Sequence, residues 1–213
     1  MKTDELIASL ARAAGAVEPN AVARRYGTAI GWGGFTATLV MALFLGVRPD
    51  LRDAALLPMF WVKLVFPGVL FVIALALAAR LARPAMPLGI APRMLVVPLI
   101  VVWAMAAIEL VGAPQADRAA LLLGRTWDVC PFYIALLSVP IFVGAFWAMK
   151  RLAPTRLARA GAACGLVAGG LGACIYALHC DEMSAAFLGT WYVIGMLIPT
   201  AVGAALGPKL LRW

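Results

Sequence analysis

The sequence is poor in charge and contains almost no histidine. Only 13% of its 213 residues are charged, one is a histidine, and 64% are hydrophobic. No water-soluble fold hides so large a fraction of apolar side chains. The single histidine, His179, also excludes haem ligation by a pair of histidines, and with it a b-type cytochrome.

Motifs of common enzymes and redox proteins are missing as well. The chain contains no H-E-x-x-H, no G-x-S-x-G, no Walker loop and no C-x-x-C. These patterns carry metal-dependent hydrolysis, acyl transfer, nucleotide binding and dithiol exchange. Their absence predicts that the chain is not an enzyme and holds no permanent cofactor.

What the sequence has instead is a series of long apolar runs. Each has about twenty residues, the length that a helix needs to cross a bilayer. We therefore predict an all-α membrane protein, a bundle of six transmembrane helices in residues 27–213. The predicted spans are residues 28–46, 64–82, 94–112, 130–149, 157–178 and 186–207.

Basic residues fall mostly on one side of these spans. Thirteen of the eighteen lie on the side of the N-terminus, and five lie on the other: Arg48, Arg52, Lys63, Arg118 and Arg125. Because basic loops resist translocation, we predict an inner-membrane protein with both termini in the cytoplasm. The same rule explains the net charge of +8, so we do not expect direct binding of nucleic acid.

The N-terminal stretch, residues 1–26, is the one cytoplasmic segment long enough to be a module. It opens with two acidic residues, which favour a first helical turn, and continues with apolar residues on one helical face. Such a short amphipathic helix lies on the lipid surface or binds a partner. Acidic residues suit anionic headgroups poorly, so partner binding is the favoured interpretation. The residues concerned are Asp4, Glu5, Leu6, Ile7 and Leu10.

Glycines repeat at intervals of four residues in two predicted spans. Gly161, Gly165 and Gly169 do so in the fifth span, and Gly203 and Gly207 in the sixth. This spacing is typical of close helix packing in membranes. It predicts a tightly packed bundle and leaves a homodimer open.

Ionisable side chains are nearly absent from the predicted spans. Glu109 lies near the outer end of the third, and we expect its carboxylate to reach the periplasmic surface. A small transporter of metal or solute needs polar groups deep in the membrane, and is therefore a less favoured alternative. A membrane thiol oxidoreductase is another, which the missing C-x-x-C disfavours.

The four cysteines divide into two pairs by position. Cys164 and Cys174 lie within the fifth span and should pack as small apolar residues. Cys130 opens the fourth span and Cys180 follows the fifth, which puts both at the periplasmic face, where disulfides are permitted. They form a permanent staple, or a reversible pair that responds to oxidants or binds a soft metal transiently. The candidate metal ligands are Cys130, His179 and Cys180.

Several segments together resemble the NrsF family of membrane-bound anti-sigma factors, and the resemblance extends over nearly the whole chain. They are the opening MKTDELIASL, Thr126, Trp127 and Cys130 before the fourth span, the glycine-rich fifth span, Tyr176 to Cys180, Phe187, Trp191 and Tyr192, and the closing Leu211, Arg212 and Trp213.

This resemblance implies a function that composition alone does not. It implies an anti-sigma factor that holds an extracytoplasmic-function sigma factor at the inner membrane and releases it under stress. Cys130 and Cys180 would be the sensor thiols, with His179 as an accessory. The sigma-binding helix would contain Asp4, Glu5, Leu6, Ile7 and Leu10.

Overall fold

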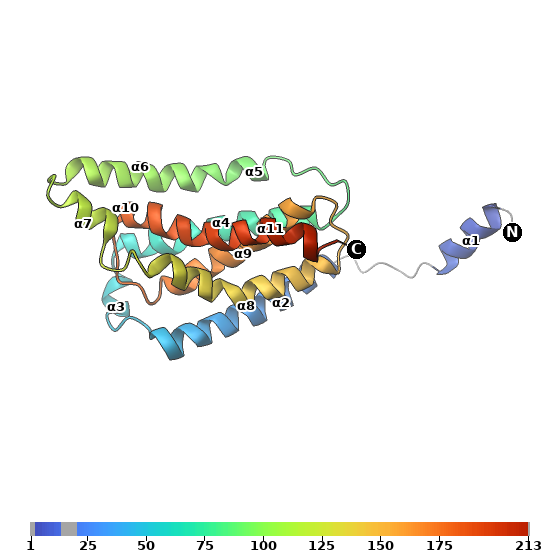
Figure 1. The fold of residues 1–213 in the computed structure, drawn as a ribbon, viewed down its shortest axis with the longest axis horizontal. Helices are drawn as coiled ribbons and strands as arrows, with labels where there is room; N and C mark the ends of the chain where they lie inside the picture. Colours follow the sequence, from blue (N-terminus) through green and yellow to red (C-terminus); the bar gives the residue numbers. More distant parts are fainter. Residues whose placement is uncertain (1–2, 14–20, 213) are drawn as a thin grey trace.

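The computed structural model describes residues 3–13 and 21–212, and its regular structure is entirely helical (Figure 1). Helix α1 (Thr3–Ala13) is set apart from a bundle that the later helices form. No residue of α1 is buried.

Six helices of the described residues are long and apolar enough to cross a membrane, as the sequence predicts. The first is α2 (Ala21–Val40) with its π-helical extension η1 (Met41–Leu45), and the second is α4 (Pro58–Leu81). The short α5 (Ala91–Met94) precedes α6 (Val96–Gly112). Then follow α8 (Cys130–Lys150), α9 (Leu157–Tyr176), and α10 (Ala185–Phe187) continued by π-helical η2 (Leu188–Tyr192) and α11 (Val193–Leu210). Helices α3 (Leu51–Ala54) and α7 (Arg118–Leu123) lie in loops.

The first two spans begin earlier than predicted. They start at residues 22 and 58, against predicted starts at 28 and 64. Leu57 is extended and Pro58 occupies the first turn of α4, a position where the missing proline N–H costs nothing. Lys63, which the sequence prediction placed in a loop, therefore lies inside α4.

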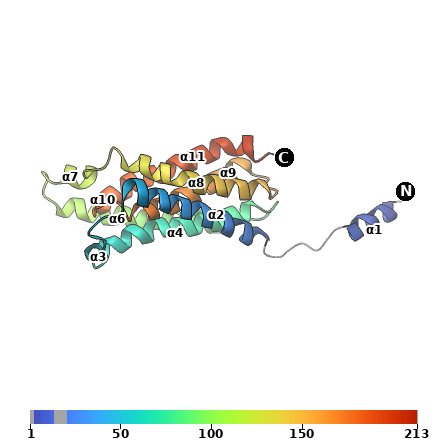
Figure 2. The same cartoon turned by 90° about the horizontal axis from the view of Figure 1, so that it is seen from below.

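The bundle has two distinct ends (Figure 2). Helices α3, α7 and α10 gather at one end, which we name the cysteine end because Cys130 and Cys180 lie there. Helix α2 begins and α11 ends at the opposite end, which we name the basic end after its arginines, such as Arg83. The start of α2 and the end of α11 thus lie on the same side.

Helix α9 lies at the centre and packs on α4, α8 and α11. Its contact with α11 brings the two backbones together. A Cβ added to Gly161 would collide with the Gly203 carbonyl, and one added to Gly165 would collide with the Pro199 carbonyl. The glycine repeat is therefore buried inside one chain and offers no face for a homodimer.

Glu109 joins α6 to α10. Its Oε2 accepts hydrogen bonds from the Ser184 hydroxyl at 2.9 Å and from the Ala186 N–H at 3.0 Å. A carboxylate is favoured there because the first N–H groups of a helix have no intrahelical partner. Glu109 is half-buried in this contact, near the end of α6, and its exposure at the periplasmic surface stays a prediction.

Replacing Gly165 by alanine should weaken the contact between α9 and α11. The added methyl group would meet backbone atoms of Pro199, which cannot rotate away. We expect Gly165→Ala to destabilise the purified protein by about 1–3 kcal/mol, seen as a lower melting temperature in detergent. Gly112→Ala is the matched control, because a Cβ there meets nothing within 4 Å. Equal melting temperatures of the two variants would contradict the packing.

Candidate functional site

The structure brings Cys130 and Cys180 to one site at the cysteine end. Cys130 is the first residue of α8 and is fully buried, and Cys180 follows α9 with 3% of its surface exposed. Both are free thiols within one apolar cluster. They lie close enough for a charge on one sulfur to act on the other. The two predicted sensor residues are thus neighbours.

Two tyrosines pack around the thiols. Tyr176 and Tyr192 are almost fully buried, and their ring centroids lie 5.8 Å apart. Tyr176 lies beside Cys130, and Tyr192 lies beside Cys180. The Tyr192 hydroxyl is buried and has no well-formed hydrogen bond within the described part of the chain. The two sulfurs are therefore held without strong polar contacts.

Lys63 is the third component of the site. Its side chain is 2% exposed, and Nζ donates to the carbonyl oxygens of Cys180 at 2.6 Å and of Glu182 at 2.8 Å. The ammonium also lies 5.7 Å from the centroid of the Tyr192 ring. A buried charge is costly unless its hydrogen bonds are made. Lys63 therefore fixes the loop after α9 to α4.

Arg48 binds the same carbonyl oxygen as Lys63. Its Nη1 donates to Cys180 O at 3.2 Å, while Nε and Nη2 donate to the two Asp50 carboxylate oxygens at 2.8 and 2.7 Å. These paired hydrogen bonds raise the pKa of Arg48 and lower the pKa of Asp50 from their ordinary values. Arg48 thereby ties the loop after η1 to the loop that carries Cys180.

The segment before α8 closes over the Cys180 loop. The Arg125 backbone N–H donates to Glu182 Oε1 at 2.6 Å, and its guanidinium Nη2 pairs with Asp181 Oδ2 at 2.6 Å. Trp191 Nε1 donates to the Leu122 carbonyl at 2.9 Å. Both thiols consequently lie beneath a layer of loop contacts.

A pocket of about 490 Å³ leads to one of the two thiols. Cys180, His179, Tyr176 and Arg48 line it, whereas Cys130 does not. Cys180 is thus the thiol nearer to this opening, and Cys130 lies behind it.

His179 contacts the loop after η1. Its Nδ1 lies 2.8 Å from the Gly46 carbonyl oxygen, so that nitrogen carries the proton as donor. Within residues 3–13 and 21–212, no three His, Cys, Asp or Glu side chains are arranged so that they could hold a metal ion. The set of Cys130, His179 and Cys180 is not assembled here, and soft-metal binding stays a prediction.

The predicted sigma-binding residues all lie on α1, away from the thiols. Asp4 and Glu5 occupy its first turn. Leu6, Ile7 and Leu10 expose 40%, 59% and 60% of their surfaces, so this apolar set is uncovered.

Sequence reasoning did not single out Lys63 or Arg48. The signal for Lys63 is a lysine inside an otherwise apolar run that follows Pro58. Arg48 carries no such signal, because its contact with Cys180 joins residues that are 132 positions apart.

Known proteins match this chain over nearly all of its length. The NrsF family, described as negative regulator of sigma F, matches residues 10–213. The chain belongs to the NrsF family. It is 50% identical over 213 residues to the probable anti-sigma-F factor NrsF of Azospira oryzae. It is 38% identical over 217 residues to the anti-sigma-F factor NrsF of Caulobacter vibrioides, and both alignments cover 100% of each chain. No solved structure matches the chain.

As a member of the NrsF family, the chain is a negative regulator of a sigma factor. The residues that the family matches include Arg48, Lys63, Cys130 and Cys180. The match begins at Leu10, so the first turns of α1 precede it, although both NrsF relatives align over the whole chain.

Lys63→Met should loosen the Cys180 loop. Methionine has a similar length but no donors, so the carbonyls of Cys180 and Glu182 lose their buried partner. We expect a maleimide to alkylate Cys180 roughly tenfold faster than in the wild type, because hydrogen bonds to a charged group are lost. The rate is measured in native membranes by mass spectrometry of the peptide that contains Cys180.

The matched control is Lys150→Met, which removes the same charge at the basic end. It should leave the alkylation rate at its wild-type value. If both variants react at the wild-type rate, Lys63 does not hold the loop.

Proposed function

We propose that the chain is an anti-sigma factor that holds an extracytoplasmic-function sigma factor at the inner membrane and releases it when Cys130 and Cys180 are oxidised. The observation that carries the proposal is a buried pair of free thiols beside a carbonyl that two cations share. The family supplies the sigma factor as the regulated partner.

In this proposal the sigma factor binds α1. Leu6, Ile7 and Leu10 are exposed, and their burial against a groove of the partner would remove apolar surface from water. Asp4 and Glu5 add negative charge to the first turn, which suits a basic rim around such a groove. The basic end of the bundle, from which α1 extends, would then face the cytoplasm.

The cysteine end would face the periplasm, where disulfides persist. A two-electron oxidant such as hydrogen peroxide would enter through the pocket and react first with Cys180. The thiol becomes a sulfenic acid and one water leaves; Cys130 then displaces the hydroxyl as a second water, and the S–S bond forms. A soft metal would need both thiolates and a rearranged His179, so the arrangement favours oxidation as the trigger.

Arg48 offers a route from the thiols to α2. A new S–S bond moves residue 180, and its carbonyl carries the hydrogen bonds from Arg48 and Lys63. Arg48 comes shortly after η1, which continues α2, and α2 is the first helix after α1 along the chain. A change from mostly bound to mostly free sigma factor requires a difference of about 5.5 kcal/mol between the two states. Formation of a covalent bond in only one state can provide it.

Co-purification tests the binding part of the proposal. Tagged Leu10→Asp protein from gently solubilised native membranes should retain at least roughly tenfold less sigma factor than the wild type, because a charge would replace a leucine that the bound sigma factor covers. Ala8→Asp adds the same charge on another face of α1 and should retain the sigma factor. If the two variants behave alike, or if no sigma factor co-purifies with the wild type, the binding assignment is wrong.

Oxidation of isolated membranes tests the sensing part separately. After treatment with hydrogen peroxide, wild-type protein should lose its sigma factor, whereas Cys130→Ser and Cys180→Ser should keep it. Cys164→Ser and Cys174→Ser are the controls and should respond as the wild type does. Release from the Cys130 and Cys180 variants would leave the anti-sigma function standing and remove the thiol pair as its sensor.

A further inference from the structure

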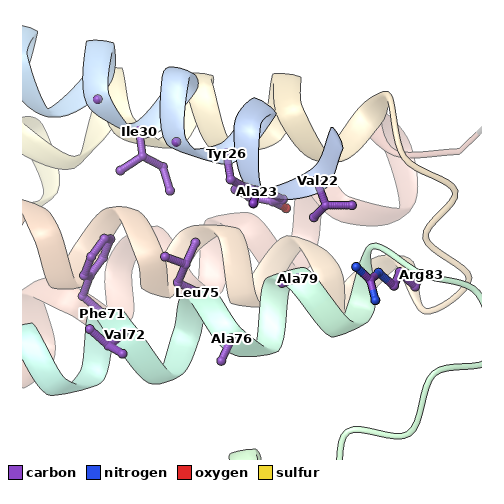
Figure 3. A pocket seen from close by; sticks show the side chains of 12 residues that line it. Val22, Ala23, Tyr26, Ile30, Phe71, Val72, Leu75, Ala76, Ala79 and Arg83 are labelled. Carbon is purple, nitrogen blue, oxygen red and sulfur yellow. The ribbon is translucent and has the colours of Figure 1, made fainter. Parts of the chain in front are cut away.

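Helices α2 and α4 leave an apolar groove between them near the basic end (Figure 3). Its volume is about 700 Å³, with Val22 and Ile30 on the α2 side and Phe71 and Leu75 on the α4 side. Helix α2 packs mainly on α8 and α4 packs mainly on α9, so neither fills the space. Both helices are long and apolar enough to cross a membrane, which would put the groove at the depth of lipid acyl chains.

Two glycines of α2 open this groove. A Cβ on Gly27 or Gly31 would meet nothing within 4 Å. Gly33 on the same helix differs, because a Cβ there would lie 2.7 Å from the Cα of Ile141. Gly33 serves the packing of α2 on α8, whereas Gly27 and Gly31 border empty space among the described residues.

Arg83 stands at the mouth of the groove, just beyond the end of α4. Its side chain is exposed and forms no hydrogen bond or ion pair with any residue that the structure describes. Two other arginines of the basic end are engaged: Arg25 donates to the Arg151 carbonyl at 2.9 Å, and Arg80 donates to the Leu88 carbonyl at 2.7 Å. The guanidinium of Arg83 is thus available at the level of lipid headgroups.

We propose that this groove binds one anionic phospholipid. An acyl chain lies between α2 and α4 over Gly27 and Gly31, and the phosphate accepts hydrogen bonds from Arg83. Apolar crevices between spans suit anionic lipids when a basic residue lies at one end. The acyl chain then contacts only apolar side chains, and the phosphate meets a positive charge.

A second copy of the chain is a poorer occupant. Two copies insert into the membrane in the same orientation, so a helix of the second copy would bring its own basic end against Arg83. The positive charges of the two basic ends would repel each other. The phospholipid instead neutralises Arg83 and links α2 to α4, two helices that otherwise touch little.

Native mass spectrometry of the full-length protein in detergent tests the site, with phosphatidylglycerol or phosphatidylcholine added. The wild type should retain one phosphatidylglycerol. Gly27→Leu and Gly31→Leu fill the groove and should weaken retention at least roughly tenfold. Gly112→Leu also adds a side chain in open space, but outside the groove, and should retain the lipid.

The headgroup contact is tested with a second pair of variants. Arg83→Gln should reduce the preference for phosphatidylglycerol over phosphatidylcholine by about fivefold. Arg93→Gln removes the same charge at the basic end without lining the groove and should keep the preference. Melting temperatures of all variants establish that each is folded.

Three results would overturn the proposal. One is equal retention of lipid by Gly27→Leu, Gly112→Leu and the wild type. Another is an unchanged headgroup preference in Arg83→Gln. The third is a wild-type dimer that Gly27→Leu abolishes, because a second copy would then occupy the groove.

Discussion

The carbonyl oxygen of Cys180 is the acceptor on which the cysteine end depends. Lys63 and Arg48 both donate to it, at 2.6 and 3.2 Å. Charged donors in an apolar interior need acceptors, since a buried charge that loses its partner costs about 3–5 kcal/mol. The loop after α9 is therefore fixed relative to both α2 and α4. This backbone contact, and no bond between the sulfurs, places Cys180 beside Cys130.

The sequence predicts those features of the fold that the bilayer itself dictates. Six apolar runs become six helices long and apolar enough to span a membrane, because a segment in lipid must satisfy its own backbone. The same apolar runs also predict that Cys130 and Cys180 lie at the ends of helices. The predicted second span starts at residue 64 and leaves Lys63 in a loop, whereas its acceptors, which stabilise it inside α4, come from a segment more than 115 residues away. The sequence likewise gives no sign of the hydrogen bond from Ser184 to Glu109, because the two residues are 75 positions apart.

Glycine spacing shows how one sequence pattern serves two opposite arrangements. Gly161 and Gly165 are four residues apart and bring α9 into backbone contact with α11. Gly27 and Gly31 have the same spacing, yet a Cβ on either would meet no described residue within 4 Å. Helix α9 is consequently held on several sides, whereas α2 rests mainly on α8. A helix with one packed face loses fewer contacts when it shifts than a helix at the centre of the bundle.

This difference makes α2 the span best suited to connect the two ends of the protein. A helix moves as a unit, because hydrogen bonds between successive turns preserve its length. The π-helical turn η1 lies between α2 and Arg48, and such turns depart from the regular hydrogen-bond ladder. A displacement of the Cys180 loop would therefore reach α2 through a turn whose hydrogen bonds already differ from the α-helical pattern. At the far end of α2, the groove beside α4 leaves room for that movement. A lipid bound in the groove would change the free energy that the movement of α2 costs.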